Sequence, residues 1–497
     1  MTDTAPPRTL PEPPTTEAAA SYPVLRWLVA ATFTVILNET IMVNAIPRLM
    51  AEFAVSARSA QWLSTAFMLT MAVVIPVTGW FLQRVTTRTA FTVAMSTFAT
   101  GTVICLLAPV FPVLVAGRVV QAAGTAVMFP LLMTTLMTVV AERDRGRVMG
   151  NVTLAISVAP ALGPALSGLV LGVAGWRWLF GVVLPVVALV SVVGLRRLTD
   201  VGEPRDSAVD WLSVVMSALG FGGLVYGLSR IGEENPGAVP AGVWIAGGLA
   251  VLAAFVLRQR ALTRRSEPLL DLRTLTHRTY ALALSVQALG FLTMLGTMIL
   301  LPLYLQDLRG LSPLRTGLLL APGGLAMGLL GPVVGRVFDR RGGRVLVVPG
   351  ALGVPLALAG LSRIGESTPY AAILGVQALL MVGLAALFTP AFTLGLGALP
   401  RHLYSHGSSL LGTAQQVAAA VGTAVTVTVL SWRSAQLTDA GASDAAAYVG
   451  GVRAAFGVAA VLAVGLVVLA AFLPNRSSTP ADEPAVREPA GEGAPVS

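Results

Sequence analysis

The sequence predicts an all-α polytopic membrane protein with fourteen transmembrane helices. Of its 497 residues, 55% are hydrophobic and only 11% are charged, whereas soluble domains carry about 25% charged residues. The apolar residues gather in fourteen runs, each near the roughly 20 residues that a helix needs to cross a bilayer. The arginines fall mainly between these runs, and one alternating set of loops holds more of them than the other.

Each apolar run is taken as one span, because helices satisfy their backbone hydrogen bonds internally in lipid. In chain order the predicted spans are 24–47, 60–82, 89–109, 112–138, 148–172, 176–196, 210–230, 241–258, 279–305, 314–336, 344–362, 369–395, 404–432 and 450–473. The glycine-rich runs 210–230 and 241–258 carry the weakest signal, so twelve or thirteen spans remain open alternatives.

The loop arginines orient these spans. If the N-terminus lies inside, the inner loops carry nineteen arginines and the outer loops carry nine. Short cytoplasmic loops are enriched in basic residues. We therefore expect a multi-pass protein of the plasma membrane with both termini in the cytoplasm, which an even number of spans satisfies.

The composition also argues against several classes of function. The net charge of +9 is explained by the loop arginines, so no nucleic-acid partner is expected. The chain has no lysine and no nucleotide-binding loop, and no metal cluster or nucleophile motif indicates an enzyme. Cys105 is the only cysteine, so neither a disulfide nor a cysteine-based metal site is expected, and no cofactor. His277, His402 and His406 are expected in loops, which would exclude a buried histidine relay.

One acidic residue, Glu39, lies well inside a span-length run, in the stretch from Leu37 to Pro47. A carboxyl group at membrane depth is expensive and is functional by default. We interpret Glu39 as a group that takes up and releases a proton. The alternative is a carboxylate that only hydrogen-bonds to a neighbouring helix.

A weak internal repeat divides the chain into related halves. Gly79–Arg88 ends the second run, and Gly335–Arg344, with the pattern Gly-x-x-x-Asp-Arg-x-Gly-x-Arg, ends the tenth. Two further stretches stand out, Leu114–Gly124 in the fourth run and Ala159–Gly168 in the fifth. Repeats of this kind build alternating-access transporters, and two inserted spans would separate the halves.

With the Leu37–Pro47 stretch, these motifs make the chain resemble the fourteen-span drug:proton antiporters of the major facilitator superfamily. Its Leu-Asn-Glu-Thr sequence looks like that of the lincomycin-type exporters in this family. The resemblance implies the major facilitator fold, with two six-helix bundles and two inserted helices. The expected segments are a disordered tail (1–23), an N-terminal bundle (24–198), the inserted pair with linkers (199–278), a C-terminal bundle (279–473) and a second tail (474–497).

The resemblance also implies roles for several residues. The proton-coupling group comprises Glu39, Arg118, Asn38 and Gln121, and Arg118 is expected near Glu39 or Asn38. The antiporter motif comprises Pro160, Gly163, Pro164 and Gly168, and a conformational lock comprises Asp339, Arg340, Arg344, Arg84 and Arg88. Most members have aspartate where this chain has Asn38, and the acid here is the next residue, Glu39. A shift of one residue moves the acid about 100° around the helix. It also has Gln83 in place of the acid in the first lock motif.

A substrate pocket is expected between the halves near mid-membrane. Its candidate lining is apolar and adaptable with a few polar groups, namely Asn44, Met42, Phe129, Gln287, Met294, Met298, Phe388 and Gln415. Most such residues simply pack helices, which is the alternative for each. The implied function is proton-coupled export of amphipathic, often cationic, drugs or antibiotics by a monomer in contact with membrane lipids. A dedicated exporter of one endogenous metabolite, antibiotic or lipid remains an alternative.

Overall fold

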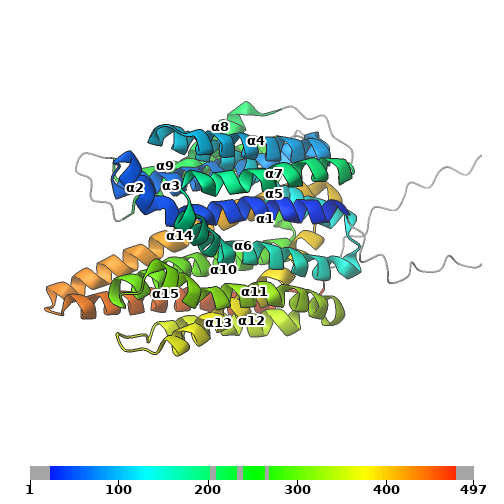
Figure 1. Ribbon diagram of the computed structural model, residues 1–497. Helices are drawn as coiled ribbons and strands as arrows, with labels where there is room; N and C mark the ends of the chain where they lie inside the picture. The colour runs from blue at the N-terminus through cyan, green and yellow to red at the C-terminus, as the bar shows by residue number, and fades with distance from the viewer. Residues whose placement is uncertain (1–22, 202–208, 232–238, 264–267, 477–497) are drawn as a thin grey trace, which may run out of the picture.

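The computed structural model describes residues 23–201, 209–231, 239–263 and 268–476, and every regular element in these ranges is a helix (Figure 1). Fourteen helices, α1 and α3–α15, are at least 18 residues long. Thirteen of them are both long and apolar enough to cross a membrane, and the other, α6, has 29 residues. The predicted all-α polytopic fold is confirmed. Most of the two predicted tails lies outside the described residues.

The helices follow the predicted spans closely. The first bundle contains α1 (Pro23–Ile41), η2 (Met42–Ala45), α2 (Ile46–Phe53), α3 (Ala57–Arg84), α4 (Thr87–Leu107), α5 (Phe111–Val139), η3 (Glu142–Asp144), α6 (Arg145–Val173) and α7 (Arg177–Arg197). The inserted segment contains α8 (Trp211–Ser229), α9 (Ala241–Thr263) and η4 (Leu272–Thr276). The second bundle contains α10 (Arg278–Leu303), η5 (Tyr304–Leu308), α11 (Pro313–Arg341), α12 (Arg344–Leu361), α13 (Tyr370–Gly397), η6 (Arg401–Leu403), α14 (Tyr404–Asp439) and α15 (Asp444–Phe472).

The first span is broken, which its apolar pattern did not predict. The α-helix stops at Ile41, a 3₁₀ turn follows over Met42–Ala45, and α2 resumes the chain. Pro47 in the first turn of α2 has no N–H to continue the ladder of α1. A 3₁₀ stretch within a span often marks a hinge, and this one lies three residues beyond Glu39.

The two bundles lie one above the other in Figure 1 and diverge from right to left. We call the end where α1 begins and α15 ends the terminal face, and the other end the distal face. After α15 the chain folds back at the terminal face onto the loop between α11 and α12. There the N–H groups of Gly343 and Arg344 donate to the carbonyl and side-chain oxygens of Asn475, at 2.7 and 3.1 Å.

Two helix pairs make the most extensive contacts between the bundles, near the terminal face: α6 packs on α11, and α3 packs on α14. The first contact depends on glycines, since a Cβ on Gly331 would lie 2.5 Å from the carbonyl oxygen of Gly150. Gly146 and Gly335 meet in the same way one turn closer to the terminal face. Glycine permits such backbone approach. Because the backbones of α6 and α11 touch at these glycines, the terminal face is closed in this structure.

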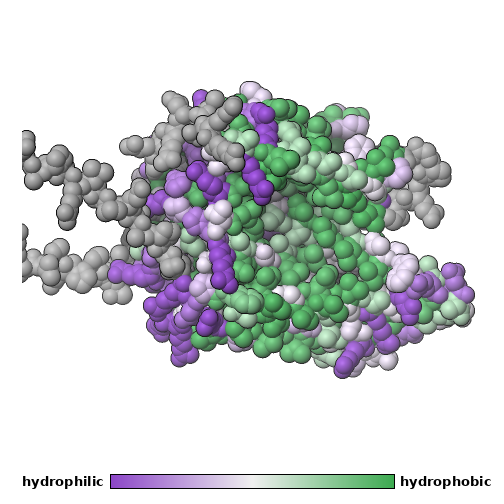
Figure 2. Space-filling model, turned by 180° about the vertical axis from the view of Figure 1, so that it is seen from behind, coloured by the Kyte–Doolittle hydropathy of each residue, from purple (hydrophilic) through white to green (hydrophobic). Residues whose placement is uncertain are grey.

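The inserted pair lies across the second of these contacts. Helix α8 packs on α3 from the first bundle and on α14 from the second. Helix α9 packs on α8 and presents an exposed apolar surface that includes Val243, Leu249 and Leu257. Figure 2 shows a broad hydrophobic band between two hydrophilic ends, as a bilayer requires.

A bidentate ion pair holds the inserted hairpin together. The Nε and Nη2 atoms of Arg258 each donate to a carboxylate oxygen of Asp210 at 2.7 Å. The hydrogen bonds from Arg258 hold the pKa of Asp210, which precedes α8, at about 2. The pair is therefore intact at neutral pH.

We expect Asp210→Asn to lower the melting temperature of the purified protein at pH 7. An aspartate whose pKa is depressed in the folded state stabilises that state above its ordinary pKa near 4, and the contribution is lost as pH falls toward about 2. The difference from the unaltered protein should therefore shrink as pH falls through this window. Asp439→Asn, at an exposed acid that ends α14, is the control. A difference that stays constant over the window would contradict this account.

Candidate functional site

Glu39 lies in the last turn of α1, directly before the 3₁₀ turn. Its side chain is partly buried, and the preceding Asn38 is buried with no hydrogen-bond partner for its Nδ2 among the described residues. Helices α5, α6 and α7 pack around α1. The carboxyl group is therefore inside the first bundle, at the point where the helix axis is interrupted.

Arg118 on α5 is a buried cation of this bundle, with 2% of its surface exposed. Its Nη1 donates to Gln121 Oε1 at 3.0 Å, and its guanidinium lies 4.1 Å from the centre of the Phe67 ring on α3. Gln121 in turn donates from Nε2 to Thr102 Oγ1 on α4 at 2.9 Å. Arg118 is thus held by a hydrogen-bonded chain and a cation–π contact, while its Nε finds no partner among the described residues.

Glycines bring α4 and α5 close enough to build this chain. A Cβ on Gly117 would lie 2.6 Å from Cys105 Sγ, and one on Gly101 would lie 2.8 Å from Gln121 Cγ. One on Gly124 would lie 2.5 Å from the carbonyl oxygen of Ala94. The Leu114–Gly124 motif therefore positions Gln121 against α4 through backbone contact.

Glu39 and Arg118 interact through their charges without forming a direct ion pair. Inside a bundle this attraction is weakly screened, because the surroundings are less polar than water. Protonation of Glu39 would remove a negative charge that the buried guanidinium faces. The arrangement can therefore convert proton binding into a change of force on α5.

The predicted antiporter motif on α6 meets the same end of α1. Gly163 is buried against Thr40, the residue after Glu39, and a Cβ on Gly163 would lie 2.7 Å from Thr40 Cβ. A Cβ on Gly168 would meet no atom within 4 Å, and Pro160 is partly buried. The side chain of Pro164 lies outside the described residues. The structure therefore separates two glycines that the motif groups together.

Asp339 near the end of α11 bridges the two bundles at the terminal face. Its Oδ1 accepts from the N–H of Gly146 at 2.9 Å, and its Oδ2 accepts from the N–H of Arg147 at 2.7 Å. These donors belong to the first turn of α6, where unpaired N–H groups and the helix dipole attract an anion. The acid therefore caps a helix of the opposite bundle.

The arginines predicted to form the lock with Asp339 make other contacts. The N–H of Arg88 donates to Asp200 Oδ1 and its Nη2 to the carbonyl of Leu195, both at 3.0 Å and both within the first bundle. The guanidinium of Arg84 lies 5.7 Å from the Trp80 ring centre. Arg340 and Arg344 contact the returning chain at Arg476 and Asn475 through their backbone atoms. At the ends of α6 and α11, the hydrogen bonds between the bundles thus run from backbone amides of α6 to the carboxylate of Asp339.

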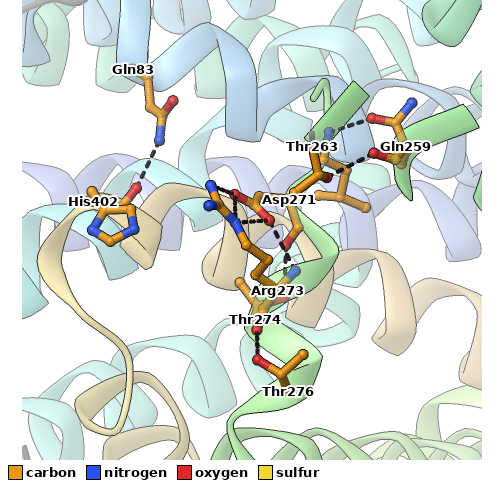
Figure 3. Close-up of polar contacts among 9 residues, drawn as sticks. Gln83, Gln259, Thr263, Asp271, Arg273, Thr274, Thr276 and His402 are labelled. Carbon is orange, nitrogen blue, oxygen red and sulfur yellow. Dashed lines mark hydrogen bonds and ion pairs between the residues drawn. The ribbon is translucent and has the colours of Figure 1, made fainter. Parts of the chain in front are cut away.

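The α3/α14 contact is the counterpart of this cap, and its polar partners differ. Gln83 Nε2 donates to the carbonyl oxygen of His402 at 2.8 Å (Figure 3). His406 was expected in a loop, but this is wrong: it lies in the first turn of α14, buried against Gly79. Because Gly79 has no side chain, α3 leaves room for the imidazole. His402 lies in η6, and His277 immediately precedes α10.

The candidate pocket residues occupy different environments. Met42, Gln287, Phe388 and Gln415 are buried, Phe129 and Met294 are partly buried, and Met298 is 46% exposed. Gln287 Nε2 donates to the Phe388 carbonyl at 3.1 Å, and the Phe129 ring lies 5.8 Å from that of Phe392 across the bundles. The Oε1 of Gln287 and the Nε2 of Gln415 have no partner among the described residues. The side chain of Asn44 lies outside those residues.

Sequence reasoning missed three residues that shape the site: Thr102, Phe67 and Thr40. Each is an ordinary residue of an apolar helix whose importance comes from a neighbouring helix. Only Thr40 carried a signal, because it adjoins Glu39. The other two required knowledge of which helices touch.

The fold and site define a membrane transporter with two helical bundles and a buried acid–base pair. The chain belongs to the Major Facilitator Superfamily, whose family model matches residues 28–423. It is 37% identical over 463 residues to the MFS-type transporter YcnB of Bacillus subtilis, covering 93% of this chain and 96% of the relative. The predicted membership of the multidrug and lincomycin-type exporters is confirmed.

Two further relatives carry resistance names. The lincomycin resistance protein LmrB of Listeria innocua is 37% identical over 409 residues, covering 82% of this chain and 86% of the relative. A multidrug resistance protein B homolog of Mycobacterium tuberculosis is 30% identical over 411 residues, covering 80% and 74%. Among solved structures, the human organic anion transporter MFSD10 matches with a TM-score of 0.67 at 15% identity, covering 92% of this chain and 100% of that one. This last likeness concerns the fold alone.

We expect Gly163→Ala to impair transport and Gly168→Ala to leave it unchanged. A methyl group at residue 163 would enter the space of Thr40, and overpacking of this kind costs about 1–3 kcal/mol. At residue 168 it would meet nothing. Transport rates normalised to the amount of folded protein in the membrane measure the difference. Equal loss in both variants would show that the contact with Thr40 is not what matters.

We expect Asp339→Asn to make the terminal face open more often. Asparagine keeps the size but loses the charge at the α6 terminus, for which about 1 kcal/mol is typical, or roughly a fivefold change in population. The labelling rate of Leu154→Cys, on the α6 surface that faces α11, reports opening. Asp144→Asn, at an acid beside the same helix end without a cap bond, is the control. Unchanged labelling in Asp339→Asn would rule out the cap as a lock.

Proposed function

We propose that this transporter is a proton-coupled antiporter that exports amphipathic, often cationic, drugs or antibiotics, with Glu39 as the proton carrier. The observation that carries the proposal is the position of Glu39, within charge reach of buried Arg118 and beside the interruption of the first span. A titratable group next to a helix break can change its surroundings as the break bends.

Proton binding and release would proceed as follows. Ionised Glu39 attracts Arg118 and draws α1 toward α5. A proton that enters from the face then open neutralises Glu39 and weakens this attraction. The 3₁₀ turn at Met42–Ala45 absorbs the resulting movement of α1, and Thr40 transmits it to Gly163 on α6. Release of the proton on the opposite side would reset the pair, and a cationic substrate would compete with the proton for the negative charge.

The orientation that we propose follows from the arginine bias. With the terminal face in the cytoplasm, the inner loops carry nineteen arginines against nine outside. The structure, closed at that face through α6/α11 and α3/α14, then represents a state open to the outside. In this state Asp339 acts as the lock that must release before the cytoplasmic side opens.

The chemistry between the bundles supports an amphipathic substrate. Phe129 and Phe392 meet across the bundles, Met294 lies on α10, and Gln287 and Gln415 each retain an unused polar atom. Aromatic and methionine side chains adapt to varied apolar ligands, while the amides can orient a polar group. We propose that the protein works as a monomer, because one chain supplies both bundles and the residues that meet between them.

We expect Glu39→Gln to abolish efflux driven by an imposed pH gradient while the protein still folds and inserts. Glutamine keeps the shape and the hydrogen-bonding capacity but cannot exchange a proton. The measurement is efflux of dyes, quaternary ammonium compounds and lincosamides from a sensitive host, with and without an uncoupler. Sensitivity to the uncoupler in the unaltered protein tests the energy source, and the panel tests whether one or many compounds are exported.

Glu52→Gln is the matched control. Glu52 lies on α2 at the distal face, where hydrogen bonds from Arg177 and Trp176 lower its pKa, so it remains ionised and has no part in proton exchange. This variant should retain gradient-driven efflux. Undiminished efflux by Glu39→Gln would remove Glu39 from the mechanism.

A further inference from the structure

The α3/α14 contact contains a buried titratable group outside the Glu39 site. His406 is 4% exposed, and its Nδ1 has no hydrogen-bond partner among the described residues. The same nitrogen would lie 3.0 Å from a Cβ on Gly79 of α3. Three residues further along α14, Ser409 Oγ donates to the carbonyl of Ile75 on α3 at 2.5 Å. The imidazole is therefore packed into the contact that closes the terminal face.

A loop from the inserted segment brings charges to this imidazole. Asp271 is buried, interacts electrostatically with His406, and is held by Arg273 through Nη2–Oδ2 and Nε–Oδ2 contacts of 2.6 and 2.9 Å (Figure 3). Burial opposes ionisation of Asp271, but hydrogen bonds from the side chain and backbone of Arg273 lower its pKa on balance. Asp271 is thus a carboxylate already matched by a cation.

The other elements packed around His406 supply no further negative charge in the described contacts. Helix α3 presents Gly79, η6 presents His402, and α10 presents Tyr280, whose hydroxyl donates to the Gly407 carbonyl at 2.7 Å. A protonated His406 would therefore be surrounded by Asp271, whose charge is already balanced by Arg273, by Arg273 itself and by His402. The added positive charge would be buried without a partner of its own, which is unfavourable.

We propose that His406 is a second protonation site, which admits protons from the terminal face, and that its protonation loosens the α3/α14 contact. The neutral imidazole fits between α3 and α14 and keeps the terminal face closed. The imidazolium requires water or an unmatched carboxylate, which it gains when α14 separates from α3. Acid on the terminal side thus favours opening of that side, independently of the proton carried by Glu39.

The position of the inserted hairpin supports this assignment. Gln259 at the end of α9 accepts from the N–H of Leu270 at 3.2 Å and donates to Ser213 Oγ on α8 at 2.7 Å. Leu269, Leu270 and Phe255 form an apolar cluster against side chains of both α3 and α14. These contacts fix the loop at the seam between the bundles and hold Asp271 and Arg273 beside His406.

The test measures opening of the terminal face as a function of pH in the full-length chain. Spin labels on Arg143→Cys and Arg401→Cys report the distance between the bundles, after the sole cysteine is removed by Cys105→Ala. All samples carry Glu39→Gln and Asp339→Asn, which remove the other proposed proton site and the carboxylate that caps α6 at the same face. Between about pH 8 and pH 5.5, where an imidazole ordinarily titrates, we expect the long-distance population to at least double. In His406→Gln it should stay constant.

His402→Gln is the matched control, because the contact with Gln83 uses only the backbone carbonyl of His402, and the pH response should persist. Should His406→Gln not fold, NMR of labelled histidines in the otherwise unaltered protein decides the question. The His406 signal, assigned with His277→Gln and His402→Gln, must titrate together with the distance change. A pH response that persists in His406→Gln, no response when His406 is present, or a His406 signal that does not titrate with the change overturns the proposal.

Discussion

A guanidinium buried between membrane helices is the constraint on which the first bundle depends. Arg118 does not readily lose its proton, and its removal from water must be offset by the groups around it. Gln121, Thr102 and the Phe67 ring provide only dipoles and a quadrupole. In its ionised form, Glu39 would supply a compensating negative charge at a distance. Because that charge can be removed by a proton, the balance that holds α1, α3, α4 and α5 together depends on the state of one carboxyl group.

The two contacts that close the terminal face are related by the internal repeat but differ chemically. In α6/α11, Asp339 is aligned with backbone N–H groups, and glycines meet glycines. In α3/α14, Gln83 replaces the acid and His406 occupies the space beside Gly79. The first contact combines a charge with a helix end and is strong at neutral pH. In the second, the closed form buries an uncharged imidazole, so protonation of His406 would add a charge there.

The fold was predictable because backbone N–H and C=O groups must be hydrogen-bonded within the protein in lipid. An apolar run of sufficient length therefore forms a helix. The break after Ile41 was not predicted, although Pro47 signalled it, because hydropathy continues across the 3₁₀ turn. At the site, sequence pointed to Glu39 and Arg118 as charges within spans. It gave no means of finding Thr102 or Phe67, whose roles depend on which helices touch.

The predicted lock shows the same limit. Its acid was identified from a motif, but its partners are backbone amides of α6, and a helix end has no residue type of its own to recognise. His406 was expected in a loop. Only the missing side chain of Gly79, far away in sequence, makes a buried position available to it.

Helix α6 connects the surroundings of Glu39 to the Asp339 cap. Near mid-span Gly163 contacts Thr40, one residue from Glu39, while at its start Gly146 and Arg147 donate to Asp339. Between them, Thr153 is hydrogen-bonded to Thr389 of the second bundle at 3.0 Å and Gly150 lies against Gly331. A helix is stiff along its axis, so a displacement of α1 at Thr40 must be shared by these contacts. Bonds to backbone amides depend on direction as well as distance, so a small rotation of α6 would weaken the Asp339 cap before the glycine contacts separate.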